Sequence, residues 1–171
     1  AFIWSEFTPL IDFLEKGQQA PLDNNAIDIL QSFDTENIHV IWSKALERRK
    51  TDPEGAITTA RTLLESVCKY ILDDRGTHHD DKKADLPKLY HLVSSELNLS
   101  PSQHTETVFK QILGGCSSVV NGLGSLRNQL GDAHGHGKNS IRPSSRHAEL
   151  AVNLAGSMAV FLIETWDFNK N

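Results

Sequence analysis

The sequence predicts an all-α protein, a bundle of four to five core helices with extra short helices at the N-terminus. Apolar residues recur at spacings of three and four over long stretches, which is the period of a helix with one buried face. Alternating apolar and polar runs, typical of half-buried strands, are scarce. With 171 residues, 39% of them hydrophobic, the chain is long enough to bury a substantial core.

The first fifty residues predict an N-terminal helical extension, separate from the main bundle of residues 51–171. Residues 2–14 are rich in apolar side chains and predict a short helix or docking arm. A second short helix is expected over residues 22–33. A third begins near Thr35 and ends in the basic cluster at residues 48–50.

Capping residues mark the first helices of the main bundle. Residues 52–54, Asp-Pro-Glu, supply a capping carboxylate, a proline at the first helical position and an acidic first turn. Gly76 is the expected end of that helix. Residues 85–87, Asp-Leu-Pro, open a shorter helix, and Ser100 with Pro101 opens a long one.

The long helix after Ser100 contains glycines at positions 114, 115, 122 and 124. Each costs about 1 kcal/mol relative to Ala inside a helix. They therefore indicate close approach of another helix, a kink, or a break near Gly114 and Gly115. A final helix is expected from Arg146 to about Asp167. Its expected buried face is Leu150, Leu154, Met158, Phe161 and Leu162.

The segment with the most suggestive chemistry lies at the end of the long helix. Arg127 and His134 are seven positions apart, almost two helical turns, so they would project from nearly one face. The guanidinium can hold a phosphate while the imidazole transfers a proton. An ordinary surface ion pair and a capping histidine are the alternative, which spacing alone slightly favours. Asn128 and the glycines that flank the histidine shift the balance towards a ligand site.

Basic residues are concentrated around this segment. The whole chain has a net charge of -5, yet residues 121–150 contain four basic and two acidic side chains. A small anionic site fits this distribution better than a broad nucleic-acid surface. We expect His136, Lys138, Arg142 and Arg146 to contact the substrate.

Two stretches, residues 55–69 and 123–135, resemble the abortive-infection C-terminal domain family. Residues 85–90 and the last helix fit the same pattern, so the resemblance covers about residues 53–166. That family is similar to the HEPN superfamily of helical-bundle ribonucleases and nucleotide-binding proteins. The resemblance therefore implies a HEPN-like helical bundle.

The family signature is an arginine, usually followed by a polar residue, and a histidine after an interval of four to six residues. Arg127, Asn128 and His134 match it, with six residues between the arginine and the histidine. The resemblance implies a metal-independent endoribonuclease of phage defence, toxin-like and without a cofactor, that leaves a 2′,3′-cyclic phosphate. It implies that His134 transfers protons, Arg127 stabilises the transition state and Asn128 orients the histidine or binds RNA. A homodimer with two facing motifs is implied, and an antitoxin or sensor domain is a further expected partner.

Three residues on the helix that begins after Asp52 allow two interpretations. Arg61, Glu65 and Lys69 are spaced one turn apart, which is typical of an exposed row of salt bridges. Alternatively, Arg61 and Glu65 face the Arg127 helix and support the site from behind. The two interpretations remain open at this point.

The sequence gives little support for a metal site or for a reactive cysteine. Residues 78–81, His-His-Asp-Asp, are better interpreted as a solvated turn than as a metal site. The His-Gly-His pair of His134 and His136 is weak evidence for a metal site, so no metal is expected. Cys68 and Cys116 are far apart and lie in apolar helical patterns, which predicts buried free thiols.

Two other classes of function remain as alternatives. The chain could be a non-catalytic RNA- or nucleotide-binding or dimerisation module of a larger defence protein, or purely a structural oligomerisation bundle. Because it begins at Ala1, we expect it to be a processed or excised part of a longer protein. No signal-sequence pattern opens it and no apolar run is long enough to span a membrane, so we expect a cytoplasmic location without a membrane partner.

Overall fold

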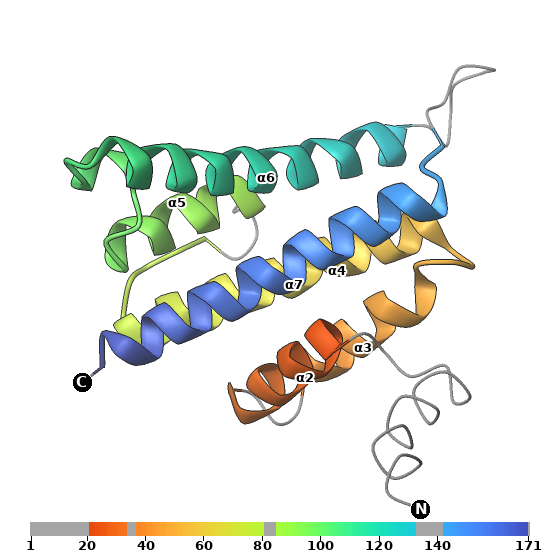
Figure 1. The fold of residues 1–171 in the computed structure, drawn as a ribbon, viewed down its shortest axis with the longest axis horizontal. Coiled ribbons are helices and arrows are strands. Elements are labelled where there is room, and N and C mark those ends of the chain that lie inside the picture. Colours follow the sequence, from red (N-terminus) through yellow and green to blue (C-terminus); the bar gives the residue numbers. More distant parts are fainter. Residues whose placement is uncertain (1–20, 34–36, 81–84, 133–141, 171) are drawn as a thin grey trace, which may run out of the picture.

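The computed structural model describes residues 21–33, 37–80, 85–132 and 142–170, without the side chains of residues 21–25 and 126–132. The described parts contain helices and no strand, which confirms the predicted all-α fold (Figure 1). The elements are α2 (Pro21–Phe33), α3 (Ile38–Arg48), α4 (Pro53–Arg75), α5 (Leu86–Glu96), the short 3₁₀ helix η1 (Pro101–Gln103), α6 (Thr107–Asp132) and α7 (Ser145–Phe168).

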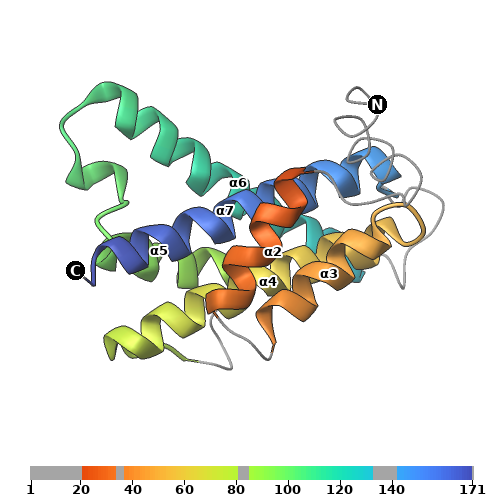
Figure 2. The same ribbon diagram turned by 60° about the horizontal axis from the view of Figure 1, so that its bottom comes forward.

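Helices α4 and α7 form the centre of the bundle and run side by side in the same direction (Figure 1). α2 and α3 pack on one side of this pair, and α5 and α6 lie on the other (Figures 1 and 2). α6 runs in the opposite direction to α4 and α7 (Figure 1). Its C-terminal end therefore lies at the end of the bundle where α4 and α7 begin.

The expected capping residues of α4 and α5 are confirmed. Asp52 accepts a hydrogen bond from the amide of Gly55 at 2.9 Å, and Asp85 accepts one from the amide of Lys88 at 3.2 Å. Each bond satisfies an amide that the first turn of a helix leaves without a partner. Gly76 ends α4 with a φ of 68°, the left-handed conformation that favours glycine.

The predicted long helix from Ser100 is wrong in its start, because Pro101 opens only the three-residue η1. Gln103 explains the interruption. Its carboxamide oxygen accepts from the amide of Ser100 at 2.9 Å and its nitrogen donates to the carbonyl of Ser95 at 3.0 Å. These bonds tie η1 back to the end of α5, and α6 begins only at Thr107.

The predicted buried face of α7 is correct for Met158 and Leu162 but wrong for Leu150, Leu154 and Phe161, which are exposed. The reason is that α7 turns a row of small residues inward, so that its backbone lies close to α4 and α3. Larger apolar side chains would keep the helices farther apart. The inward small residues are Ala148, Ala151, Ala155, Gly156 and Ala159.

The glycines of α6 have different surroundings, and the helix continues through all of them. A Cβ at Gly124 would lie 3.2 Å from the ring of Pro87 on α5, so close approach is confirmed there. Gly114, Gly115 and Gly122 have open space around them, so the expected break or close contact at Gly114 and Gly115 is wrong.

By length and composition alone, α7 is apolar enough to cross a membrane, with a mean hydropathy of 1.3 over its most apolar window. Half of that window is buried inside the bundle. The core helix of a helical bundle has the same composition, and the packing of α7 against α4 accounts for it.

The tightest point in the core lies between Gly156 and the ring of Trp42, and it gives a stability test. A Cβ at position 156 would lie 2.7 Å from Cζ3 of Trp42. Gly156→Ala should lower the free energy of unfolding by about 1–2 kcal/mol, because overpacking a core outweighs the gain in helix propensity. Urea unfolding followed by circular dichroism measures the change.

Gly115→Ala is the matched control, because position 115 faces open space in the middle of α6. It should raise the free energy of unfolding by up to about 1 kcal/mol. Equal effects of the two substitutions would show that the contact between α7 and Trp42 does not limit the core.

Candidate functional site

The last turns of α6 carry Arg127 and Asn128, five and four residues before the end of the helix at Asp132. Only their backbone is described. His134, His136 and Lys138 lie outside the described residues. The structure therefore places the start of the predicted motif at the end of the bundle where α4 and α7 begin (Figure 1).

The helical repeat relates positions 127 and 128 to earlier residues of α6 whose packing is described. Position 127 lies seven residues after Val120 and fourteen after Leu113, both of which are buried against the bundle. Position 128 lies four residues after Gly124, which packs on Pro87 of α5. Both positions therefore follow, along the helical repeat, residues of α6 that pack against the bundle.

Positive charge is present across from this end of α6. Arg142 and Arg146 are exposed just before and within the first turn of α7. The N-termini of α4 and α7 add partial positive charge, whereas the C-terminus of α6 carries partial negative charge. At the start of α4 this charge is opposed by the capping carboxylate of Asp52 and by Glu54, so a phosphate at this end of the bundle would be attracted mainly by the start of α7.

Arg61 and Glu65 form an ion pair with 2.7 Å between guanidinium and carboxylate. The exposed-row interpretation is wrong for Arg61, whose residue is only 6% exposed. Glu65 and Lys69 are partly buried. Burial arises because Arg61 lies on the inner side of α4, the helix that packs against α3, α5, α6 and α7. Support of the Arg127 helix by this pair stays a prediction.

A set of polar groups fills the junction of α4, α5 and α6. Burial raises the pKa of the Cys68 thiol to about 12, and the nearby Glu65 carboxylate adds to the shift. Burial also raises the pKa of Cys116 and brings that of Tyr90 to about 12. Both cysteines are free, and Cys68 is fully buried while Cys116 is partly exposed. These thiols stay protonated near neutral pH, which makes them poor nucleophiles.

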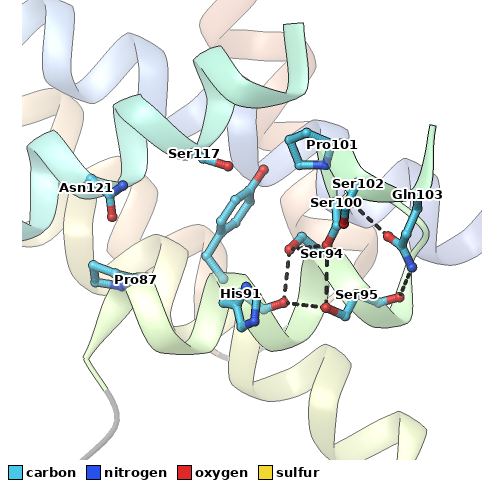
Figure 3. Close-up of a pocket in the computed structure, with 11 residues that line it drawn as sticks. Pro87, His91, Ser94, Ser95, Ser100, Pro101, Ser102, Gln103, Ser117 and Asn121 are labelled. Carbon is cyan, nitrogen blue, oxygen red and sulfur yellow. Dashed lines mark hydrogen bonds between the residues drawn. The ribbon is translucent and has the colours of Figure 1, made fainter. Parts of the chain in front are cut away.

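The sequence did not predict a groove of about 610 Å³ between α5, η1 and the middle of α6 (Figure 3). No charged side chain of Lys, Arg, Asp or Glu belongs to its described lining. Pairs of serines near the helix ends are the only sequence signal for this groove. Such pairs are too common to predict it. The lining residues are Pro87, Tyr90, His91, Ser94, Ser95, Ser100, Pro101, Ser102, Gln103, Ser117 and Asn121.

The loop after α4 is not the fully solvated turn that was expected, because the side chain of His79 contacts Asp73 of α4. Nε2 of His79 lies 2.9 Å from a carboxylate oxygen of Asp73, and the His79 side chain is 5% exposed. Asp81 lies outside the described residues. Among the residues whose side chains are described, no three of His, Cys, Asp and Glu are grouped as metal ligands.

A family model described as a HEPN-like domain, Abi_C, matches residues 36–166. The match covers well over half of the chain. The protein belongs to the HEPN-like Abi_C family. No curated protein and no solved structure matches it. The HEPN-like match includes α3, which packs on α4. The expected boundary near residue 50, between an N-terminal extension and the main bundle, stays a prediction.

The buried ion pair of the HEPN-like domain gives a second stability test. Glu65→Ala should lower the free energy of unfolding by about 2–3 kcal/mol, because it leaves the buried Arg61 guanidinium without its counter-charge. Arg61→Met should cost less, about 1 kcal/mol, since it removes the buried charge and keeps an apolar side chain of similar length. Urea unfolding measures both.

Thr62→Ala is the control on the exposed side of the same helix and should change stability by less than about 0.5 kcal/mol. If Arg61→Met destabilises as much as Glu65→Ala, the guanidinium has further essential contacts and this account of the pair is wrong.

Proposed function

We propose that this HEPN-like domain is a metal-independent endoribonuclease that acts in phage defence in the cytoplasm. The observation that carries the proposal is the Arg127-Asn128 pair in the last turns of α6, followed by His134, within a domain of this family. Arg142 and Arg146 at the start of α7 add positive charge near the same end of the bundle. These features support binding of a phosphodiester there.

In the proposed reaction, the ribose 2′-hydroxyl attacks the adjacent phosphorus and the 5′-oxygen of the next nucleotide leaves. The products are a 2′,3′-cyclic phosphate and a free 5′-hydroxyl. His134 transfers a proton in this step, since an imidazole with an ordinary pKa near ~6.5 can act as base or acid at cellular pH. Arg127 stabilises the negative charge that develops on the phosphoryl oxygens. Asn128 orients the histidine or binds the RNA.

Cleavage of this kind requires both a base and an acid, and one motif supplies a single histidine. A second copy of the chain would supply the other. Support for a homodimer comes from large apolar side chains that are exposed on α6 and α7 and that an interface could cover. The exposed side chains are Val108, Phe109 and Ile112 on α6 and Leu150, Leu154 and Phe161 on α7. An antitoxin or sensor domain is a further proposed partner.

His134→Ala and Arg127→Ala should each lower the rate of RNA cleavage by at least about 100-fold, because each removes a group that acts in the transition state. Purified protein is incubated with total RNA in the presence of EDTA, and the fragments are tested for terminal cyclic phosphate. The parent protein should cleave at an unchanged rate when EDTA is added.

His78→Ala is the matched control, an exposed histidine in the loop after α4. It should leave the cleavage rate unchanged. Cleavage that persists in His134→Ala would overturn the catalytic assignment. RNA binding without cleavage by the parent protein would favour the alternative, a binding or dimerisation module of a larger defence protein.

The proposed homodimer is tested by placing a charge at exposed apolar positions of α6 and α7. Ile112→Asp and Leu150→Asp should convert dimer to monomer in light scattering coupled to size-exclusion chromatography, since a charge buried in an apolar interface is strongly unfavourable. Gln111→Asp is the control for added charge on an exposed position of α6. A monomeric parent protein, or dimers unaffected by both substitutions, would contradict the proposal.

A further inference from the structure

The first turn of α7 is closed by a histidine. The backbone N–H of Ser144, the residue before the helix, donates to Nδ1 of His147 at 3.1 Å, and the Ser144 hydroxyl lies 3.0 Å from the same nitrogen. The carbonyl of Ser144 accepts from the amides of His147 and Ala148. Ser144 and His147 thus form a capping box in which an imidazole occupies the position that Glu or Gln usually holds.

The bond from the Ser144 amide determines the protonation state of the His147 ring. A backbone N–H can only donate, so Nδ1 must accept and carries no proton. The imidazole is therefore neutral, with its proton on Nε2. A protonated imidazole has a hydrogen on both nitrogens and accepts no hydrogen bond. Protonation of His147 and the bond from the Ser144 amide therefore exclude each other.

The surroundings of His147 leave this bond as the main influence on the ring. His147 is exposed, and its neighbours one turn further along α7, Leu150 and Ala151, are uncharged. Among the described residues, no ion pair includes His147. Charged side chains at this end of the bundle act on the ring mainly through solvent, which screens them, whereas Ser144 contacts it directly. Those described are Arg142, Arg146 and Glu149 at the start of α7, Asp52 and Glu54 at the start of α4, and Arg48, Arg49 and Lys50 at the end of α3.

Protonation of His147 would weaken the start of α7 in two ways. The Ser144 amide would lose its acceptor, and a positive charge would lie in the first turn, where the helix dipole disfavours it. The stabilisation by the cap is complete while the imidazole is neutral, and it is lost as the pH falls and the ring takes up a proton. Histidine is the side chain that ordinarily changes its charge between about pH 5 and 8. A Glu or Gln at this position would not respond in that range.

We propose that His147 is a proton-sensitive cap, which holds the first turn of α7 closed when neutral and releases it when protonated. That turn contains Arg146 and directly follows Arg142, the two described residues that we expect to contact RNA. Release of the turn would free both arginines from a fixed position, so the cap would make their placement depend on pH. The inference rests on the proposed function only in this last respect, because the cap itself does not depend on cleavage.

NMR of the full chain tests the cap directly. At about pH 7.5 the ring nitrogen shifts of His147 should show a bare Nδ1 and a protonated Nε2. As the pH is lowered to about 5.5, the Ser144 amide proton should shift together with the titration of this ring. The amides of Ala148 and Glu149 should become about three- to tenfold less protected against exchange with water, the loss expected for an opened cap. Protection is compared with that of an unstructured chain at the same pH, which removes the intrinsic pH dependence of exchange.

Two variants separate the cap from other effects of acid. His147→Gln keeps an acceptor at the capping position but does not titrate, so it should retain its amide protection at about pH 5.5. His78→Gln, the same change at an exposed histidine in the loop after α4, should lose protection in α7 as the parent protein does. A proton on Nδ1 of His147 at about pH 7.5 would overturn the proposal. Equal changes of protection in His147→Gln and the parent protein would also overturn it.

The cap and the proposed nuclease can fail independently. In a cleavage-competent protein, His147→Gln should cleave RNA at the rate of the parent protein at about pH 8 and about two- to fivefold faster at about pH 6, because only its cap stays closed. Release of α7 by acid in a protein that never cleaves RNA would support the cap and reject the nuclease. RNA cleavage with the same pH dependence in His147→Gln and the parent protein would reject the effect of the cap on cleavage and leave the nuclease standing.

Discussion

The close packing of α7 on the central helices is the constraint on which the rest of the bundle depends. Gly156 allows the ring of Trp42 to lie against the backbone of α7, and the alanines on either side of it keep α7 close to α4. Near the C-terminal end of α7, the indole N–H of Trp166 donates to Asp74 at 2.9 Å. That bond lowers the pKa of the Asp74 carboxyl below its ordinary value. Contacts in the middle and near the C-terminal end of α7 therefore fix it in parallel register with α4.

This register determines which helix ends meet. Because α4 and α7 are parallel and α6 is antiparallel to both, the N-termini of α4 and α7 lie at the same end of the bundle as the C-termini of α3 and α6 (Figure 1). The N-terminus of α4 is capped by the Asp52 carboxylate, so the partial charge that favours an anion there comes mainly from α7. Arg127 lies five residues before the end of α6 and so precedes the last turn, in which the effect of the helix dipole is strongest.

The sequence predicted those features of the fold that depend on local chemistry. Asp52, Asp85 and Gly76 mark helix ends because a capping carboxylate or a left-handed glycine acts within one turn of the chain. The buried face of α7 was not predicted correctly because periodicity identifies large apolar residues, while the packing uses small ones. The start of α6 was missed for another reason. Gln103 forms bonds with the end of α5, and the sequence of η1 alone does not reveal them.

The same distinction applies to the candidate site. The Arg127, Asn128 and His134 motif is contiguous in sequence and was identified from spacing and family resemblance. The groove was not, because its polar groups come from three elements and are brought together only by the fold. The burial of Arg61 was missed in a similar way. An i, i+4 spacing fits an exposed salt bridge equally well, and only the position of α4 at the centre of the bundle decides between them.

Pro87 connects the groove to the end of α6 in a single contact. Its ring lines the groove and also packs against Gly124, three residues before Arg127. A Cβ at position 124 would lie 3.2 Å from this ring, so the ring would have to shift by a few tenths of an ångström. The glycine therefore allows the first turn of α5 to lie close to the helix that carries the arginine. The contact between Pro87 and Gly124 thus couples the shape of the groove to the position of the last turns of α6.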